Sequence, residues 1–358
     1  MATPAQELPQ TDKPFPPIGL GTFIGIEGDD ALPAKERQQV IIDTVLSALK
    51  MGYRHIDLAE NYGNLASIGK ALRIAFADSS AGGLGIKRDE LWLTMKSDNY
   101  SLEAINDYIE LLGVDYLDTF MLHHPYGYAF KSESTLLNTW RDVTSLPKGL
   151  VKTYGISNCY TNHLLRLQAV CKKNQLPLPF SNEVESNLLA PNNDTIALSQ
   201  ALGIQVIAYS PLGYHFAKTL LTSADFLGQE NPLLKVAESL NATPAQVALA
   251  WQINRGVAVI PKSTSSERLA QNLMAIEVAE SLSEQPKLGH SLASLSTILP
   301  TVTDTAQDAL LASEALSWQV VTPSLSATSS TLLSSSNQTS SAAKEEENKA
   351  DTTISVIP

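Results

Sequence analysis

The segment VKTYGISNCYTNHLLRLQAVCKKNQLPLPFSNEVE, residues 151–185, has a strand-like run at each end and a helical pattern between them. The runs at 151–157 and 180–185 have the length and composition of β-strands. Four apolar residues recur between them at helical spacing, namely Leu164, Leu165, Leu167 and Val170. This order predicts two parallel strands joined by a helix that covers their sheet.

The same alternation continues over most of the chain. A second helical pattern is formed by Val40, Ile41, Val45, Leu46 and Leu49. The strand-like runs number eight: 19–23, 53–57, 91–96, 116–123, 151–157, 180–185, 204–210 and 257–263. Eight parallel strands with their helices favour the α/β fold class and a closed (β/α)8 TIM barrel. A doubly wound sheet is disfavoured, because no helix start follows the glycine-rich run at 19–25.

The chain divides into three parts by composition. We expect residues 1–14 to be a flexible N-terminus, residues 15–298 to form the barrel, and residues 299–358 to be a mostly disordered, low-complexity tail rich in Ser and Thr. Ser283 is expected to cap a last barrel helix with leucines at helical spacing, Leu288, Leu292 and Leu295. A further helix is conceivable around 304–321.

The composition argues against several classes of partner. A formal net charge of −12 without a run of Lys or Arg would repel a phosphate backbone, so no nucleic acid partner is expected. No stretch approaches the roughly 18 consecutive apolar residues of a membrane helix, and no signal or transit peptide is visible. We therefore expect a cytoplasmic protein, and we take it to be a monomer. Cys159 and Cys171 are expected to be reduced packing thiols, and no metal site is expected.

Four reactive side chains lie at or just after the predicted ends of strands, namely Asp57, Tyr62, Lys96 and His123. The carboxyl ends of barrel strands meet at one face, so we expect a single active site there. A phenol has an unperturbed pKa of about 10, and the ammonium of Lys96 could stabilise its phenolate. Asp57 would hold that ammonium, and His123 would orient a substrate carbonyl beside Tyr62. These groups together favour carbonyl reduction.

Five segments of the chain resemble the aldo-keto reductases, over roughly residues 15 to 285. They are GYRHIDLAENYGN (52–64), YLDTFMLHHP (116–125), YGISN (154–158), AYSPLG (208–213) and VIPKSTSSERLAQN (259–272). The resemblance implies that a nicotinamide cofactor, usually NADPH, delivers hydride to an aldehyde or ketone while a tyrosine donates the proton. It makes Tyr62 the acid, Lys96 and Asp57 the groups that tune it, and His123 the group that polarises the carbonyl.

The resemblance also implies a set of residues that bind the cofactor. Ser157 and Asn158 match positions that hydrogen-bond the nicotinamide carboxamide, and Tyr209 matches the ring that stacks on it. Ser210 and Leu212 match positions along the pyrophosphate, and Glu183 stands where the family usually has a glutamine. The phosphate site would consist of Lys262, Ser263, Thr264, Arg268 and Asn272. Two cations in that site favour a 2′-phosphate, so NADPH is expected rather than NADH.

The same residues also have structural interpretations. Asp57 and Lys96 could form an ordinary ion pair at a strand end, and His123 could be a hydrogen-bonded core histidine. Ser157 and Asn158 could cap the following helix. Two other functions stay open: a regulatory subunit that binds NADP(H) without turnover, and a scaffold whose tail is an interaction arm. The main hypothesis is an NADPH-dependent reductase of a small-molecule carbonyl compound.

Overall fold

The computed structural model of the chain describes residues 13–24, 32–125, 129–213 and 231–295. The chain divides into two units, Met1–Trp318 and Gln319–Pro358, and every described residue belongs to the first. The predicted tail and the predicted helix around 304–321 lie outside the described residues.

Eight parallel strands form one sheet in the order of the sequence. The strands are β1 Leu20–Gly21, β2 His55–Ala59, β3 Trp92–Ser97, β4 Leu117–Leu122, β5 Val151–Ser157, β6 Ser181–Glu185, β7 Gln205–Tyr209 and β8 Val257–Val259. The sheet closes on itself, because Ile18 forms a parallel bridge to Val259 and the backbone N–H of Gly19 donates to Val259 O at 2.8 Å. This closure confirms the predicted (β/α)8 barrel.

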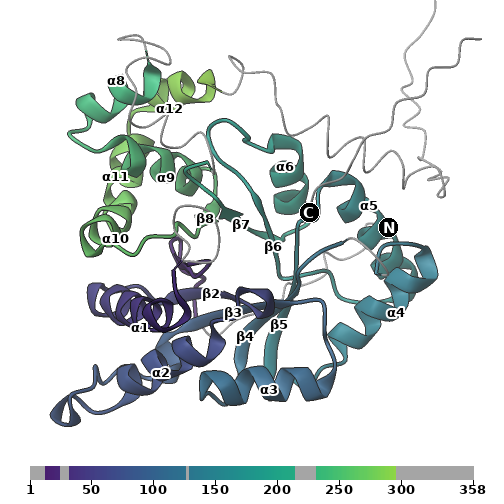
Figure 1. The fold of residues 1–358 in the computed structure, drawn as a ribbon. Helices are drawn as coiled ribbons and strands as arrows, with labels where there is room; N and C mark the ends of the chain where they lie inside the picture. The colour runs from purple at the N-terminus through teal and green to yellow at the C-terminus, as the bar shows by residue number, and fades with distance from the viewer. Residues whose placement is uncertain (1–12, 25–31, 126–128, 214–230, 296–358) are drawn as a thin grey trace, which may run out of the picture. The chain divides into compact units, whose positions relative to one another are not determined.

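Helices connect and flank the strands, as Figure 1 shows. They are α1 Ala34–Met51, α2 Leu65–Phe76, α3 Leu102–Leu112, α4 Glu133–Thr144, α5 Thr161–Asn174, α6 Asn193–Ala201, α8 Pro232–Ser239, α9 Pro244–Asn254, α10 Ser266–Leu273, α11 Ala275–Ser283 and α12 Pro286–Ala293. Three short 3-10 helices are η2 Glu60–Tyr62, η3 Ser79–Ala81 and η4 Arg88–Glu90. Apolar faces of the helices form one large core with the outer face of the barrel.

Several predicted boundaries are wrong, each for a local reason. Strand β2 begins at His55 rather than at 53, because the end of α1 still occupies the residues before it. Gly52 has a left-handed φ of 109°, and the backbone N–H of Tyr53 donates to Ala48 O at the end of the helix. Strand β8 ends at Val259, and Pro261, which has no N–H to donate, follows it closely.

The end of the barrel also differs from the prediction. Ser283 is the last residue of α11 rather than the cap of a later helix, and α12 begins afresh at Pro286. Leu292 and Leu295 are buried as expected, whereas Leu165 of α5 is exposed on the outer face of its helix.

The barrel interior holds an apolar layer formed by Met121, Ile207, Ala258 and Ile260. Gly155 makes room for this layer, because a Cβ on it would lie 2.7 Å from Met121 Cγ and 2.9 Å from Ser181 Oγ. In the strand register Met121 lies opposite Lys96 and Ile207 lies opposite Glu183, so this layer borders the predicted active site.

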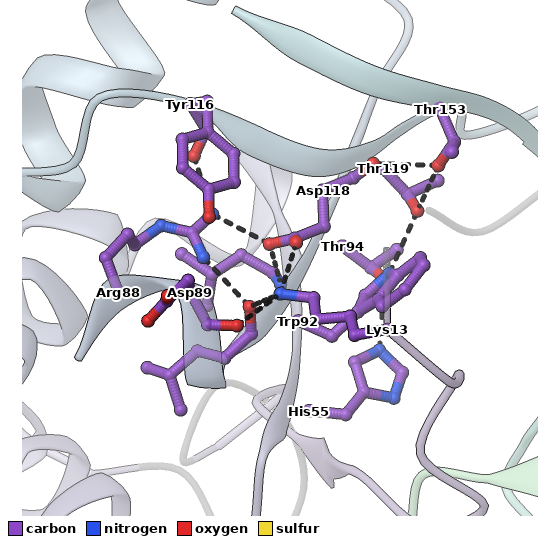
Figure 2. Close-up of polar contacts among 12 residues, drawn as sticks. Lys13, His55, Arg88, Asp89, Trp92, Thr94, Tyr116, Asp118, Thr119 and Thr153 are labelled. Carbon is purple, nitrogen blue, oxygen red and sulfur yellow. Dashed lines mark hydrogen bonds and ion pairs between the residues drawn. The ribbon is translucent and has the colours of Figure 1, made fainter. Parts of the chain in front are cut away.

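The amino-terminal network centres on Asp118 of β4 (Figure 2). Lys13 Nζ and Arg88 Nη2 each lie 2.7 Å from its carboxylate, and the backbone N–H of Leu93 donates to it at 2.9 Å. The segment before β1 is thereby attached to β3 and β4, and Phe15 packs edge-on against the ring of Trp92 with centroids 4.8 Å apart.

Candidate active site

The four predicted catalytic residues come together at the carboxyl end of the barrel. Asp57 lies in the middle of β2, not at its end as predicted, and Lys96 lies near the end of β3. Tyr62 is the last residue of η2, and His123 follows β4 directly. In the register of β2 and β3, Lys96 lies opposite Ala59, two residues beyond Asp57.

Lys96 is the centre of a buried ion cluster. Its side chain is 1% exposed and forms ion pairs with Asp57 and, at 2.9 Å, with Oε1 of Glu183 on β6. Burial favours the neutral amine, but the charges of Asp57 and Glu183 together outweigh it and hold the pKa of Lys96 above its ordinary value. Lys96 is therefore a fixed cation at neutral pH.

The two carboxyl groups of this cluster share a single ammonium. Burial, and then the charge of Asp57, raise the pKa of Glu183 to about 8, although Lys96 lowers it in part. Burial also raises the pKa of Asp57, against the lowering effect of Lys96. Glu183 was predicted as a cofactor ligand, and its ion pair with Lys96 was missed.

Tyr62 is half-buried beside this cluster, with Lys96 Nζ 5.4 Å from its ring centroid. Phe23 contacts the ring edge-on with centroids 5.0 Å apart. Burial raises the pKa of Tyr62 above its ordinary value, while the charge of Lys96 and its hydrogen bond lower it. In the structure the stabilising effect of Lys96 on the phenolate therefore opposes a larger effect of burial.

His123 is a neutral imidazole next to Tyr62. The two ring centroids are 6.2 Å apart at an interplanar angle of 79°. Burial, and then the positive charge of Lys96, lower the pKa of His123 to about 3. A neutral ring has one N–H, so His123 can donate a hydrogen bond to a carbonyl oxygen without carrying charge.

Asn158 links His123 to the predicted cofactor residues on β5 and β7. Its Nδ2 donates to His123 O at 2.9 Å and to Ser157 Oγ at 3.2 Å, and its Oδ1 accepts from Tyr209 Oη at 2.8 Å. Ser157 Oγ in turn donates to the backbone O of Glu183 at 3.0 Å. One hydrogen-bonded chain thus runs from Tyr209 to the strand that carries Glu183.

The interpretation of Ser157 and Asn158 as helix caps is wrong. Helix α5 begins at Thr161, and the backbone N–H of Tyr160 donates to Nδ1 of His163 at its first turn. Asn158 instead has a left-handed φ of 57° where β5 ends, and Ser210 has a φ of 44° just after β7. Left-handed non-glycine residues are uncommon and cluster at functional sites.

Four of the predicted phosphate residues lie just before α10 or in its first turn, and the fifth, Asn272, lies near its end. Ser265 caps the helix by accepting from the N–H of Arg268, and the buried Ser263 accepts from Arg268 Nε at 3.2 Å. Asn272 is buried on the same helix, whereas the side chains of Lys262 and Thr264 are exposed. Leu212 is half-buried against the apolar core.

Comparison with known proteins agrees with this geometry. The model of the Aldo/keto reductase family matches residues 17–286, which is most of the chain. The chain belongs to the aldo/keto reductase family.

Three proteins illustrate what this aldo/keto reductase is similar to. It is 32% identical over 299 residues to D/L-glyceraldehyde reductase of Hypocrea jecorina, covering 77% of this chain and 85% of that protein. It is 32% identical over 289 residues to glycerol 2-dehydrogenase (NADP(+)) of Saccharomyces cerevisiae, covering 73% and 83%. The crystal structure of a Bombyx mori aldo-keto reductase in complex with NADP matches it with a TM-score of 0.65 at 25% identity, covering 82% and 94%.

Two groups of supporting contacts in this aldo/keto reductase were not predicted. Thr22 Oγ1 donates to the backbone O of Asp57 at 2.6 Å, and Asn64 Nδ2 donates to Thr22 O at 2.7 Å. Asp98 accepts from the N–H of His124 and lies 2.9 Å from its Nδ1, and the His124 ring stacks on His123 with centroids 4.1 Å apart. Thr22, Asp98 and His124 lie just after strand ends, and this position is the sequence signal that could have identified them.

Two features are absent from the described parts of this aldo/keto reductase. Within residues 13–24, 32–125, 129–213 and 231–295, no three His, Cys, Asp or Glu side chains are grouped so that they could hold a metal ion. No helix in these ranges has the length and apolar character needed to cross a membrane.

Proposed function

We propose that this chain is an NADPH-dependent reductase of aldehydes or ketones in which Tyr62 donates the proton. The observation that carries the proposal is the buried Lys96, which lies against two carboxyl groups beside Tyr62 and within the same site as His123. Membership of the aldo/keto reductase family and the reductases among its relatives support it.

The substrate carbonyl oxygen would accept hydrogen bonds from Tyr62 Oη and from an N–H of His123. Both donors then face the oxygen on which negative charge develops. NADPH supplies the hydride to the carbonyl carbon when it is bound. The proton moves from Tyr62 Oη to the alkoxide oxygen, which is more basic than a phenolate, and the O–H bond of the tyrosine breaks.

Lys96 would stabilise the phenolate that remains on Tyr62 after the proton has left. Asp57 and Glu183 hold the ammonium in place, and burial of Lys96 keeps its charge from being screened by water. His123 would position the carbonyl while uncharged, because its pKa is lowered to about 3. It would therefore not compete with Tyr62 as the proton donor at neutral pH.

The residues present fit a nicotinamide dinucleotide phosphate. Glu183 Oε2 is buried and has no hydrogen-bond partner among the described residues, which marks a place for a further polar group. At α10, backbone N–H groups and the exposed guanidinium of Arg268, oriented by Ser263, suit a phosphate. Ser157, Asn158 and Tyr209 would hold the nicotinamide end.

The hydrogen bonds of Asn158 set a condition on this assignment. Both hydrogens of its amide are already donated, to His123 O and Ser157 Oγ. A carboxamide would therefore be bound through the remaining lone pair of Asn158 Oδ1, or after one of these bonds has exchanged.

The printed names of two relatives suggest a first set of substrates. One is a reductase of D/L-glyceraldehyde and the other an NADP(+)-dependent glycerol dehydrogenase. We propose that short hydroxylated aldehydes and ketones are substrates of this chain. We also propose that its reaction is reversible, since one relative is named as a reductase and the other as a dehydrogenase.

The proposal is tested by Tyr62→Phe. Loss of a positioned general acid typically costs about 10²–10⁴-fold in rate, so kcat should fall by that factor. The dissociation constant of NADPH, measured by quenching of protein fluorescence, should change less than about twofold, because the phenol serves chemistry rather than cofactor binding. Tyr116→Phe, at the amino-terminal end of the barrel, is the matched control and should retain the activity.

Two results would count against the proposal. Turnover of glyceraldehyde by Tyr62→Phe at the wild-type rate would show that Tyr62 is not the proton donor. Tight NADPH binding by the wild type, with no oxidation of NADPH by any aldehyde or ketone, would instead favour a regulatory subunit that binds the cofactor without turnover.

A further inference from the structure

The catalytic lysine of the proposed site has one carboxylate more than its charge requires. Asp57 alone would neutralise Lys96, yet Glu183 Oε1 also lies 2.9 Å from the ammonium. Glu183 is buried, and its second oxygen, Oε2, has no hydrogen-bond partner in the described part of the chain. With all three groups ionised, the cluster would have a net charge of −1 in a site shielded from water.

The groups around Glu183 determine how easily it gives up its proton. Asp57 from β2 and Lys96 from β3 lie against its carboxyl group, and the hydroxyls of Tyr62 and Tyr209 are near enough for its charge to raise their pKa values. From β5, the backbone N–H of Asn158 and Oγ of Ser157 bond its main-chain oxygen, not its carboxyl group.

This balance places the ionisation of Glu183 near neutral pH. Burial and the negative charge of Asp57 raise its pKa to about 8, and Lys96 lowers it only in part. Glu183 is therefore largely neutral at pH 6.5 and largely ionised at pH 9.5.

The charge of Glu183 would lie close to the reacting ring of the cofactor. Lys96 is 2.9 Å from Glu183 Oε1 and 5.4 Å from the ring centroid of Tyr62. A hydride donor must approach a carbonyl carbon to about 3–3.5 Å while the carbonyl oxygen is bonded to Tyr62. The nicotinamide ring is uncharged when reduced and positively charged when oxidised, so a buried anion beside it distinguishes the two forms.

Resting on the function proposed above, we propose that Glu183 couples proton binding in the lysine cluster to the redox form of the cofactor. Neutral Glu183 favours the reduced, uncharged nicotinamide. Ionised Glu183 favours the oxidised, positively charged one. The same site would thus retain NADPH better in mildly acidic solution and NADP⁺ better in alkaline solution, which shifts the enzyme from carbonyl reduction towards alcohol oxidation.

Linkage makes the coupling reciprocal. If ionised Glu183 binds NADP⁺ more tightly, then NADP⁺ must lower the pKa of Glu183 when it binds. Near pH 8, binding of NADP⁺ should therefore release protons to the solvent, and binding of NADPH should release fewer or take protons up.

The first test measures the dissociation constants of NADPH and NADP⁺ by quenching of protein fluorescence from pH 6.5 to 9.5. In the wild type, the ratio of the NADP⁺ constant to the NADPH constant should fall by about tenfold over this range. The 2′-phosphate and surface groups ionise alike with both forms, so their effects cancel in the ratio. Glu183→Gln keeps the shape of the side chain without its charge, and its ratio should be independent of pH.

Glu280→Gln is the matched control, because Glu280 is an exposed glutamate on α11. Its ratio should fall with pH as in the wild type. A wild-type ratio that is independent of pH would overturn the proposal, and so would an equal slope in Glu183→Gln.

A second measurement needs only the wild-type protein, in case Glu183→Gln fails to fold. Titration calorimetry of each cofactor at pH 8, in two buffers of different ionisation enthalpy, counts the protons released. We expect NADP⁺ to release at least about 0.3 proton more than NADPH, and equal numbers would overturn the proposal. Failure of the proposed function would look different, because neither cofactor would then bind, or both would bind without turnover.

Discussion

Single side chains show why burial has to be considered before charge in this site. A lysine next to a tyrosine suggests an acidic phenol, yet the structure buries Tyr62 beside two carboxylates as well as Lys96. Desolvation and the carboxylates raise the pKa of the phenol, and only Lys96 lowers it. In the proposed mechanism, Lys96 would therefore mainly stabilise the phenolate that remains after proton transfer.

Arg268 provides a test of the proposed preference for NADPH. Its guanidinium is exposed at the start of α10 and oriented by Ser263 at 3.2 Å. Arg268→Ala should weaken NADPH binding by about 10–100-fold, because a charge-assisted contact to the 2′-phosphate is lost. NADH has no such phosphate, so its dissociation constant should change less than about twofold by fluorescence quenching.

The control for this prediction is Arg141→Ala, which removes an exposed arginine from α4. It should leave both dissociation constants as they are. Equal weakening of NADPH and NADH by Arg268→Ala would show that Arg268 only supports the local fold through Ser263.

Among the secondary structure elements, α5 shows how a buried histidine can replace an ordinary cap. Nδ1 of His163 accepts the backbone N–H of Tyr160, which only a ring without a proton on that nitrogen can do. Burial, and then the charge of Arg166, lower the pKa of His163 to about 4. The ring also contacts Phe130 edge-on with centroids 5.4 Å apart.

His163→Ala should therefore destabilise the protein in a pH-dependent way. At pH 7.5 it should lower the free energy of unfolding by about 2–3 kcal/mol, because a buried N–H loses its acceptor and a cavity forms. A depressed pKa contributes stability above the unfolded value of about 6.5, and that stability is lost as the pH falls towards 4. The free energy of unfolding that His163→Ala loses relative to the wild type should thus be about 2 kcal/mol smaller at pH 5 than at pH 7.5.

Urea unfolding at the two pH values measures this effect. His290→Ala, which removes an exposed histidine from α12, should match the wild type at both. A difference between His163→Ala and the wild type that stays constant with pH would contradict the assignment of a neutral His163.

The barrel as a whole has a stabilising end and a proposed active-site end. At the amino ends of the strands, Asp118 attaches Lys13, Arg88 and the N–H of Leu93 to one carboxylate (Figure 2). The proposed catalytic residues lie towards the carboxyl ends of the strands or just after them. Substitutions at the amino ends should therefore change the stability of the protein, and substitutions at the carboxyl ends should change its activity.

Asp118→Asn tests whether the two ends of the barrel act independently. It should lower the free energy of unfolding by about 2–4 kcal/mol, since Lys13 and Arg88 lose their shared carboxylate. The contribution of Lys13 is the smaller one, because Lys13 is less buried and its charge is screened by water. The dissociation constant of NADPH and kcat at 20 °C should stay within about twofold of the wild type. The measurements are thermal unfolding and steady-state kinetics.

Asp115→Asn is the control, because Asp115 is exposed in the turn just before β4. It should leave stability and kinetics unchanged. A loss of NADPH binding in Asp118→Asn, with the protein folded, would show that the two ends are coupled through the barrel.

The barrel could be predicted because its evidence is local in the chain. Alternation of strand-like runs with helical spacing sets the order of elements, and parallel strands in that order have few ways to pack. The positions of Tyr62, Lys96 and His123 followed from the same reasoning, since they lie at or near strand ends. The sequence motifs led in the same way to the family.

The Lys96–Glu183 contact could not be predicted, because no local pattern joins β3 to β6. The two strands are not neighbours in the sheet, and only closure of the barrel brings their inward side chains across its interior. The same closure removes water from the cluster, and burial then sets the ionisation of Glu183, Tyr62 and His123. Local periodicity thus specified the elements and their order, whereas distances and desolvation depended on the closed barrel.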